Sequence, residues 1–194
     1  MVKELRDRTG ISVMQCKAAL EEAHGDTAKA ILILSKKSGA IAAKKGDRTL
    51  GAGAISTYTH ANNEIGSMVV VRSETDFVSK NAEFVALAKE LTLQVAASNP
   101  RYVRREDIPE DTLAEIKNLF IKEVEDLPAQ AGKLAGLKET ILSGKVDAYL
   151  KNIVLMEQAY IKDPDTTVKD LIDSAIQKFG ERIEIEKFAR FSVK

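Results

Sequence analysis

Apolar side chains recur at helical spacing in three short runs at the start of the chain. The first run centres on Leu5 and ends at Gly10. The second reaches Gly25, which suits the left-handed end of a helix, and the third passes through Leu34. This pattern predicts a module of three helices over residues 1–38. Because so short a bundle has only a marginal core, we expect it to act as a docking unit on a larger domain.

The apolar period changes from helical to two after a glycine-containing stretch. Residues 39–53 contain helix-breaking glycines and are expected to form a semi-flexible linker. Residues 54–60 and 65–72 then alternate around a turn, which is typical of an antiparallel hairpin. A similar alternation over residues 183–191 predicts a terminal strand.

Helical spacing fills most of the chain between these strands. Residues 81–98 form a strong amphipathic pattern, and residues 109–122 form another. Residues 129–156 are rich in helical pattern, with breaks expected at Gly132 and Gly144.

Capping residues mark one more helix near the end of the chain. Thr166 or Thr167 suits its first cap, and Gly180 suits its end. The chain is therefore predicted to be α+β: the N-terminal module, the linker, and a core over residues 54–194 in which helices pack on a small three-stranded sheet.

The turn between the second strand and the next helix places an acid beside a bulky aromatic. In one interpretation, Asp76 or Thr75 caps the helix and Phe77 packs into the core as a staple. Local sequence slightly favours this interpretation. In the other, Ser79 and Asn81 are the better caps, and Asp76 and Phe77 project together towards a partner.

Composition limits the kinds of protein that fit. Lys and Arg total 29, as do Asp and Glu, so the chain lacks the basic surplus of a dedicated nucleic-acid binder. The single cysteine, Cys16, is expected to be a buried apolar side chain in a reducing cytosol. No apolar run approaches the ~18 residues of a membrane span, and the first residues do not resemble a signal peptide. We expect a cytoplasmic protein.

The residues also give little support for an enzyme. His24 and His60 both fall at turns, and the chain contains none of the common cysteine, zinc, nucleophile or phosphate-loop motifs. The glycines near residue 52 precede a strand and do not open a helix, as a dinucleotide loop would. We therefore expect no catalytic residues, no metal and no cofactor.

Several motifs together resemble one family. The run Glu74-Thr75-Asp76-Phe77-Val78 is similar to the signature of elongation factor Ts. The N-terminal module agrees, and so do further stretches that extend the resemblance over essentially the whole chain. These matches are Arg6, Gly10, Met14, Cys16, Lys17, Ala96-Ala97, Pro100, Glu157-Gln158 and Arg190-Phe191. The chain departs from the family at Gln94, where histidine is usual, and at Arg72-Ser73, where Asn-Cys is usual.

The resemblance implies a fold, an activity and a partner. It implies a ubiquitin-associated-like N-terminal module and a single core copy, as in short members of the family. It implies a guanine-nucleotide exchange factor that binds elongation factor Tu with GDP and promotes GDP release. It implies two sets of partner-binding residues. The set that disturbs the Mg²⁺ site of elongation factor Tu is Thr75, Asp76, Phe77 and Val78. The set on the N-terminal module is Arg6, Val13 and Met14.

Alternatives stay open at this point. Val13 and Met14 could instead be core residues of the small bundle. The whole chain could be a protein adaptor without exchange activity, or an RNA-associated translation protein that uses its clustered lysines. These are Lys36, Lys37, Lys44 and Lys45. The resemblance also allows a homodimer, through which a short member would present a complete surface.

Overall fold

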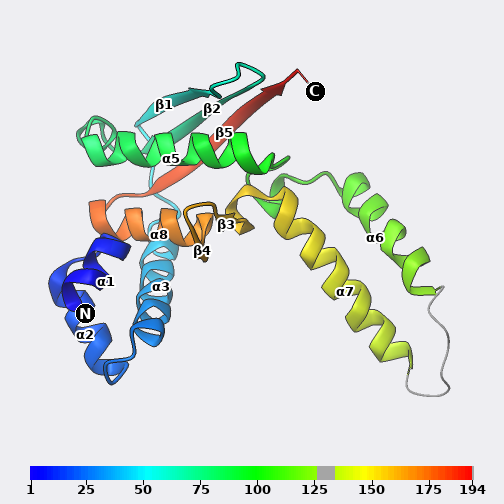
Figure 1. Ribbon diagram of the computed structural model, residues 1–194, viewed down its shortest axis with the longest axis horizontal. Helices are drawn as coiled ribbons and strands as arrows, with labels where there is room; N and C mark the ends of the chain where they lie inside the picture. The colour runs from blue at the N-terminus through cyan, green and yellow to red at the C-terminus, as the bar shows by residue number, and fades with distance from the viewer. Residues whose placement is uncertain (126–133, 194) are drawn as a thin grey trace. The chain divides into compact units, whose positions relative to one another are not determined.

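The computed structural model describes residues 1–125 and 134–193 and separates into two compact units (Figure 1). The first unit comprises Met1–Ala97 with Ala159–Lys194, and the second comprises Ser98–Gln158. The predicted boundaries after residues 38 and 53 fall inside the first unit, so the independence of the N-terminal module stays a prediction. The α+β class is confirmed.

The three N-terminal helices form where the apolar spacing predicts them. They are α1 (Val2–Thr9), α2 (Val13–Glu22) and α3 (Thr27–Ala43). Gly10 ends α1 in the left-handed region, and the Asp26 side chain caps α3 by accepting a hydrogen bond from the Lys29 N–H. A small shared core joins the helices, and Cys16 is buried in it, as predicted. Its main members are Leu5, Ile11, Cys16, Ala19, Leu20, Ala30 and Leu34.

Helix α3 is longer than the sequence pattern predicts. It continues through Gly39 to Ala43, although a mid-helix glycine costs roughly 1 kcal/mol relative to alanine. The reason is tertiary packing against α8 (Val168–Phe179). Ser38 is fully buried there and donates a hydrogen bond to Gln177 of α8. The expected linker therefore begins as helix.

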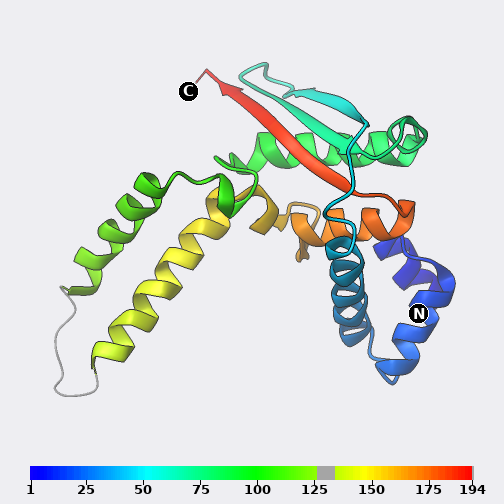
Figure 2. The same ribbon diagram turned by 180° about the vertical axis from the view of Figure 1, so that it is seen from behind.

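The sheet has the order β1 (Ala52–Thr59), β2 (Ile65–Ser73), β5 (Ile183–Ser192), and all its pairs are antiparallel. Helices α5 (Ala82–Ser98) and α8 lie on the same side of this sheet, as both ribbon views show (Figures 1 and 2). The residues that face them are buried and apolar. On the sheet they are Val69, Val71, Ile183 and Ile185. The buried residues of α5 include Phe84, Leu91 and Val95. The three strands and the helix after the hairpin are thus confirmed.

Some short elements escape the sequence pattern. The strands β3 (Ala159–Tyr160) and β4 (Asp163–Thr167) pair with each other, and α4 (Asp76–Ser79) is a single helical turn. Their residues show no clear period because contacts with distant segments hold them in place. The predicted cap of α8 is confirmed, since Thr167 exchanges hydrogen bonds with Asp170 in a capping box.

The second unit is built from two long helices that run side by side and antiparallel. They are α6 (Glu110–Glu125) and α7 (Leu134–Ile153), flanked by the short turns η1 (Arg105–Asp107) and η2 (Leu155–Glu157). Their contact buries a separate apolar cluster that includes Ile108, Ile116, Val146 and Leu150. The expected break at Gly144 is wrong: the residue lies inside α7, whose packing against α6 sustains the helix. Gly132 lies outside the described residues.

Candidate partner-binding site

The turn after β2 exposes one aromatic ring to solvent. We call residues 75–79 the Phe77 turn. Within it Val78 and Ser79 are buried, whereas the Phe77 side chain is 89% exposed. The interpretation of Phe77 as a core staple is therefore wrong. The inward face of this short turn is already taken by Val78 and Ser79, so the aromatic ring points outward.

An acidic side chain accompanies the ring. Asp76 is exposed, and one of its carboxylate oxygens accepts a hydrogen bond from Lys80 Nζ at 2.7 Å. This hydrogen bond and the ammonium charge lower the pKa of Asp76 below its ordinary value. The turn thus presents an ionised carboxylate beside an exposed aromatic ring.

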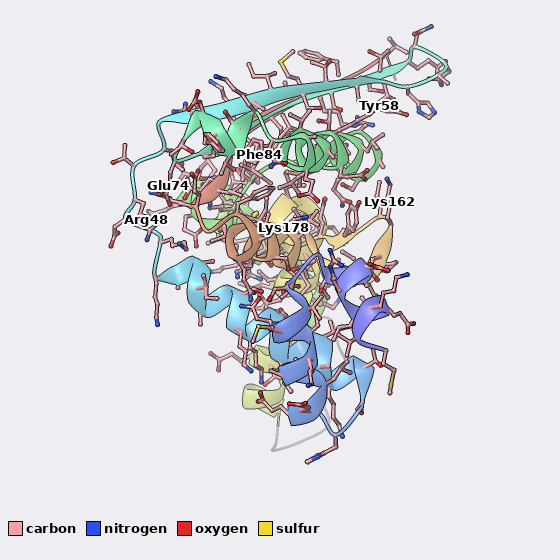
Figure 3. All side chains as sticks on the ribbon, turned by 90° about the vertical axis from the view of Figure 1, so that its left-hand side faces the viewer. Arg48, Tyr58, Glu74, Phe84, Lys162 and Lys178 are labelled. Carbon is pink, nitrogen blue, oxygen red and sulfur yellow. The ribbon has the colours of Figure 1, made fainter. Side chains whose placement is uncertain are left out.

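Two carboxylates on opposite segments hold the start of the turn. Glu181, just after α8, accepts hydrogen bonds from the Thr75 N–H at 3.0 Å and the Thr75 hydroxyl at 2.5 Å. Glu74 accepts from the Arg182 N–H at 2.5 Å and from the Arg48 guanidinium at 3.2 Å. Arg48 and Glu74 face each other in Figure 3.

The electrostatics of Glu74 keep it charged. Burial would raise its pKa, but the hydrogen bonds from Arg182 and Arg48 outweigh burial, and the pKa lies below its ordinary value. Sequence reasoning missed Glu181, Arg182 and Arg48 as parts of this site. Their separation from the turn along the chain leaves no local signal. The helix-ending Gly180 marks only where α8 stops.

The second predicted surface also faces solvent. Arg6 is exposed, and Val13 and Met14 are 50% and 83% exposed. The buried face of α2 is formed instead by Cys16 and its neighbours Ala19 and Leu20. The alternative that Val13 and Met14 are core residues of the bundle is therefore wrong.

Helix α8 connects the N-terminal helices with the segment that holds the Phe77 turn. On one side it packs against α3, and Lys45 Nζ, just after α3, donates to the carbonyl of Gly180 at 2.6 Å. Nearby, Arg8 of α1 forms ion pairs with Asp163 and Asp165 of β4, each at 3.1 Å. The three N-terminal helices are thus attached to the same unit as the Phe77 turn.

Comparison with known proteins settles the family. The family model described as Elongation factor TS matches residues 34–194. An elongation factor Ts of Carboxydothermus hydrogenoformans is 46% identical over 196 residues, which cover 100% of this chain and 87% of that protein. One of Caldanaerobacter subterraneus subsp. tengcongensis is 47% identical over 193 residues, covering 98% of this chain and 93% of that protein. The chain belongs to the elongation factor Ts family. Its members are translation elongation factors, and this chain is one.

Within this elongation factor Ts fold, Gln94 has a structural place. Its side chain is fully buried. Its Nε2 donates to the Ala159 carbonyl at 3.1 Å, and its Oε1 accepts from the Ile161 N–H at 2.9 Å. The amide thereby fixes β3 against α5, where the family usually has histidine. In this chain the Gln94 side chain is therefore bonded to the backbone of Ala159 and Ile161 and is not on the surface.

Two of the four clustered lysines of this family member, and one of its two histidines, have bonding partners in the described residues. Lys37 pairs with Glu22 at 2.7 Å, and Lys45 is bonded to a backbone carbonyl. The His60 ring nitrogen Nδ1 is 2.9 Å from the Tyr58 hydroxyl. Residues 1–125 and 134–193 contain no cluster of histidine, cysteine or carboxylate ligands that could hold a metal ion. The same residues include no helix that is long and apolar enough to cross a membrane.

Proposed function

We propose that this chain is a guanine-nucleotide exchange factor for elongation factor Tu. It binds elongation factor Tu with GDP and promotes GDP release by disturbing the Mg²⁺ and nucleotide site. This function makes and breaks no covalent bond, so the chain acts as a binding protein and not as an enzyme, without a cofactor of its own. The observation that carries the proposal is the 89% exposure of Phe77 beside the ionised carboxylate of Asp76.

The energetics of exchange require more than one contact. A nucleotide bound at nanomolar affinity is held by about 12 kcal/mol, and an exchange factor must bind the nucleotide-free state better than the loaded one. Burying a phenylalanine contributes roughly 1.5–3 kcal/mol. The Phe77 ring therefore acts as a wedge within a larger interface. Arg6, Val13 and Met14 supply a second contact on the same unit, and their exposure supports this role.

The Mg²⁺ ion is the sensible point of attack. It neutralises the phosphate charges of the bound nucleotide, so its displacement weakens nucleotide binding strongly. We propose that Thr75, Asp76, Phe77 and Val78 act there as one rigid element. Asp76 and Phe77 contact the partner, while Val78, which is buried, holds the turn in its own core.

We also propose that the chain forms a homodimer through the outer face of its sheet. On this face the register places Ile55 beside Val70, Met68 beside Ala189, and Phe191 beside Gly66. Ile55, Met68 and Phe191 are 67%, 44% and 73% exposed. The same face carries the exposed Lys187 beside Val70. A two-fold axis would set the three apolar side chains against their own copies, and the zero net charge of the chain opposes such pairing little. Phe191→Lys is expected to halve the mass measured by light scattering. If the unsubstituted chain already has the mass of a single chain, the dimer is rejected.

A nucleotide-release assay tests the exchange function against its alternatives. Elongation factor Tu carrying a fluorescent GDP analogue is mixed with this chain in excess unlabelled GDP. An exchange factor accelerates the release of the analogue, whereas an adaptor binds without acceleration. An RNA-associated protein would instead bind RNA with a steep dependence on salt.

We place the protein in the cytoplasm, where its proposed partner acts.

A further inference from the structure

We propose that Glu181 is a positioning residue for nucleotide exchange. Its carboxylate fixes Thr75 and thereby directs the Phe77 ring towards the partner. This inference rests on the proposed function and adds to it a residue distant in sequence from the Phe77 turn. Glu181 itself is not proposed to contact elongation factor Tu or the nucleotide.

The geometry at Thr75 is a two-point attachment. One oxygen of the Glu181 carboxylate accepts the Thr75 N–H at 3.0 Å, and the other accepts the Thr75 hydroxyl at 2.5 Å. Two hydrogen bonds from one residue to one charged group fix orientation as well as distance. Thr75 is the residue immediately before α4, with φ −124° and ψ 160°, so its orientation sets the direction in which the turn leaves the sheet.

The attachment has a reciprocal partner one residue away. Glu181 accepts the N–H of Thr75, while Glu74 accepts the N–H of Arg182 at 2.5 Å. The β2–β5 ladder ends where Ser73 pairs with Ile183. Beyond that pair, the two carboxylates take the place of backbone carbonyls and continue the cross-strand bonding. The sheet thus extends, through side chains, up to the start of the Phe77 turn.

The position of Glu181 is itself determined by the end of α8. Gly180 ends the helix with φ +72°, a conformation that side-chain-bearing residues rarely adopt. Its carbonyl accepts a hydrogen bond from Lys45 Nζ at 2.6 Å. The helix end is therefore tied to the residues that follow α3, and Glu181 comes directly after it and bonds to Thr75.

The turn needs such support because it is short. Helix α4 has four residues, too few to be stable by its own hydrogen bonds. The Phe77 ring is 89% exposed, so packing of the ring does not fix its direction. The backbone must do so, and it is held by Val78 on one side and by the Thr75–Glu181 attachment on the other. Loss of the attachment would leave the buried Val78 and Ser79 and the hydrogen bond from the Ser73 hydroxyl to the Thr75 carbonyl at 3.0 Å, and would give the ring a wider range of directions.

The absence of tryptophan from the sequence allows a direct test of this role. Phe77→Trp introduces the only tryptophan of the chain, and its anisotropy decay, excited where the four tyrosines do not absorb, reports the motion of the turn. In that background we expect Glu181→Ala to raise the amplitude of the fast decay roughly twofold on the nanosecond scale of loop motion. Glu181→Gln keeps an oxygen acceptor, so we expect its fast-decay amplitude to lie between those of Glu181→Ala and the chain with Glu181. The control is Glu83→Gln, because Glu83 also bonds to α8, through Lys178 at 2.8 Å, but does not touch the turn.

The second measurement is nucleotide exchange on elongation factor Tu, made with chains that keep Phe77 and lack the tryptophan substitution. We expect Glu181→Ala to lower the maximal GDP release rate about tenfold, while the affinity for nucleotide-free elongation factor Tu changes less than about threefold. A purely structural role would lower both through loss of folded protein, which far-ultraviolet circular dichroism detects. Equal anisotropy decays, or a mobile turn with an unchanged release rate, would overturn the proposal. If the unsubstituted chain fails to accelerate release, the proposed function falls, while the anisotropy still decides whether Glu181 holds the turn.

Discussion

Phe77 and Val78 are adjacent in the chain and face opposite environments: the Phe77 side chain is 89% exposed and that of Val78 is 8% exposed. Val78 packs into the protein and anchors the turn, whereas Phe77 extends into solvent. The pair explains how a four-residue helical turn can present a large apolar ring without folding it inward. It also separates the effects of substitution on stability and on exchange.

Val78→Ala should destabilise the protein and reduce exchange together. Removing two buried methyl groups costs about 1–2 kcal/mol of folding free energy. The same change loosens the turn that carries Phe77, so the GDP release rate falls too. Val85→Ala is the matched control, because Val85 lies on α5 and is 49% exposed. Thermal unfolding of both variants checks the stability, and a loss of equal size at Val85 would contradict the account.

Met14→Ala should weaken the complex with elongation factor Tu without lowering stability. The side chain is 83% exposed, and substitutions at such surface positions usually change stability within about 0.5 kcal/mol. If Met14 becomes buried against the partner, its loss should weaken binding about tenfold. Calorimetric titration of elongation factor Tu measures the change. Leu32→Ala, on the exposed side of α3, provides a comparison at 62% exposure, and equal affinities for all three proteins would reject a contact at Met14.

Acid should destabilise the attachment between α3 and α8. Burial raises the pKa of Asp170, but hydrogen bonds from Ser35 and Thr167 outweigh it, so the folded pKa is below the ordinary value. The unfolded chain then binds more protons as the pH falls, and stability present near neutral pH is lost below about pH 4. The melting temperature, followed from pH 7 to pH 3, should therefore fall less steeply for Asp170→Asn. Parallel profiles for the two proteins would show that Asp170 contributes nothing to acid sensitivity.

The sequence predicts elements best where local chemistry decides them. Helix α8 is capped by Thr167 at its start and by Gly180 at its end, because a capping side chain and a left-handed glycine act within a few residues. The end of α3 is harder to predict from the sequence, because the continuation of this helix through Gly39 depends on packing against α8. A local pattern carries no such information.

The candidate site shows the same division. The motif around Phe77 could be found from sequence, but the exposure of the Phe77 ring could not, because local sequence slightly favours a buried staple. The contact of Glu181 with Thr75 joins residues more than a hundred positions apart. Only the pairing of β2 with β5 brings those two segments together.

The most direct test of the account is GDP release from elongation factor Tu with Phe77→Ala. Folding stability should stay within about 0.5 kcal/mol, because the ring is exposed. Most binding should also survive, since Arg6, Val13 and Met14 are unchanged. The account predicts that the stopped-flow release rate at saturating variant falls about tenfold or more, the equivalent of ~1.4 kcal/mol. Equal release rates for the variant and the unsubstituted chain would contradict the central claim that the Phe77 ring drives exchange.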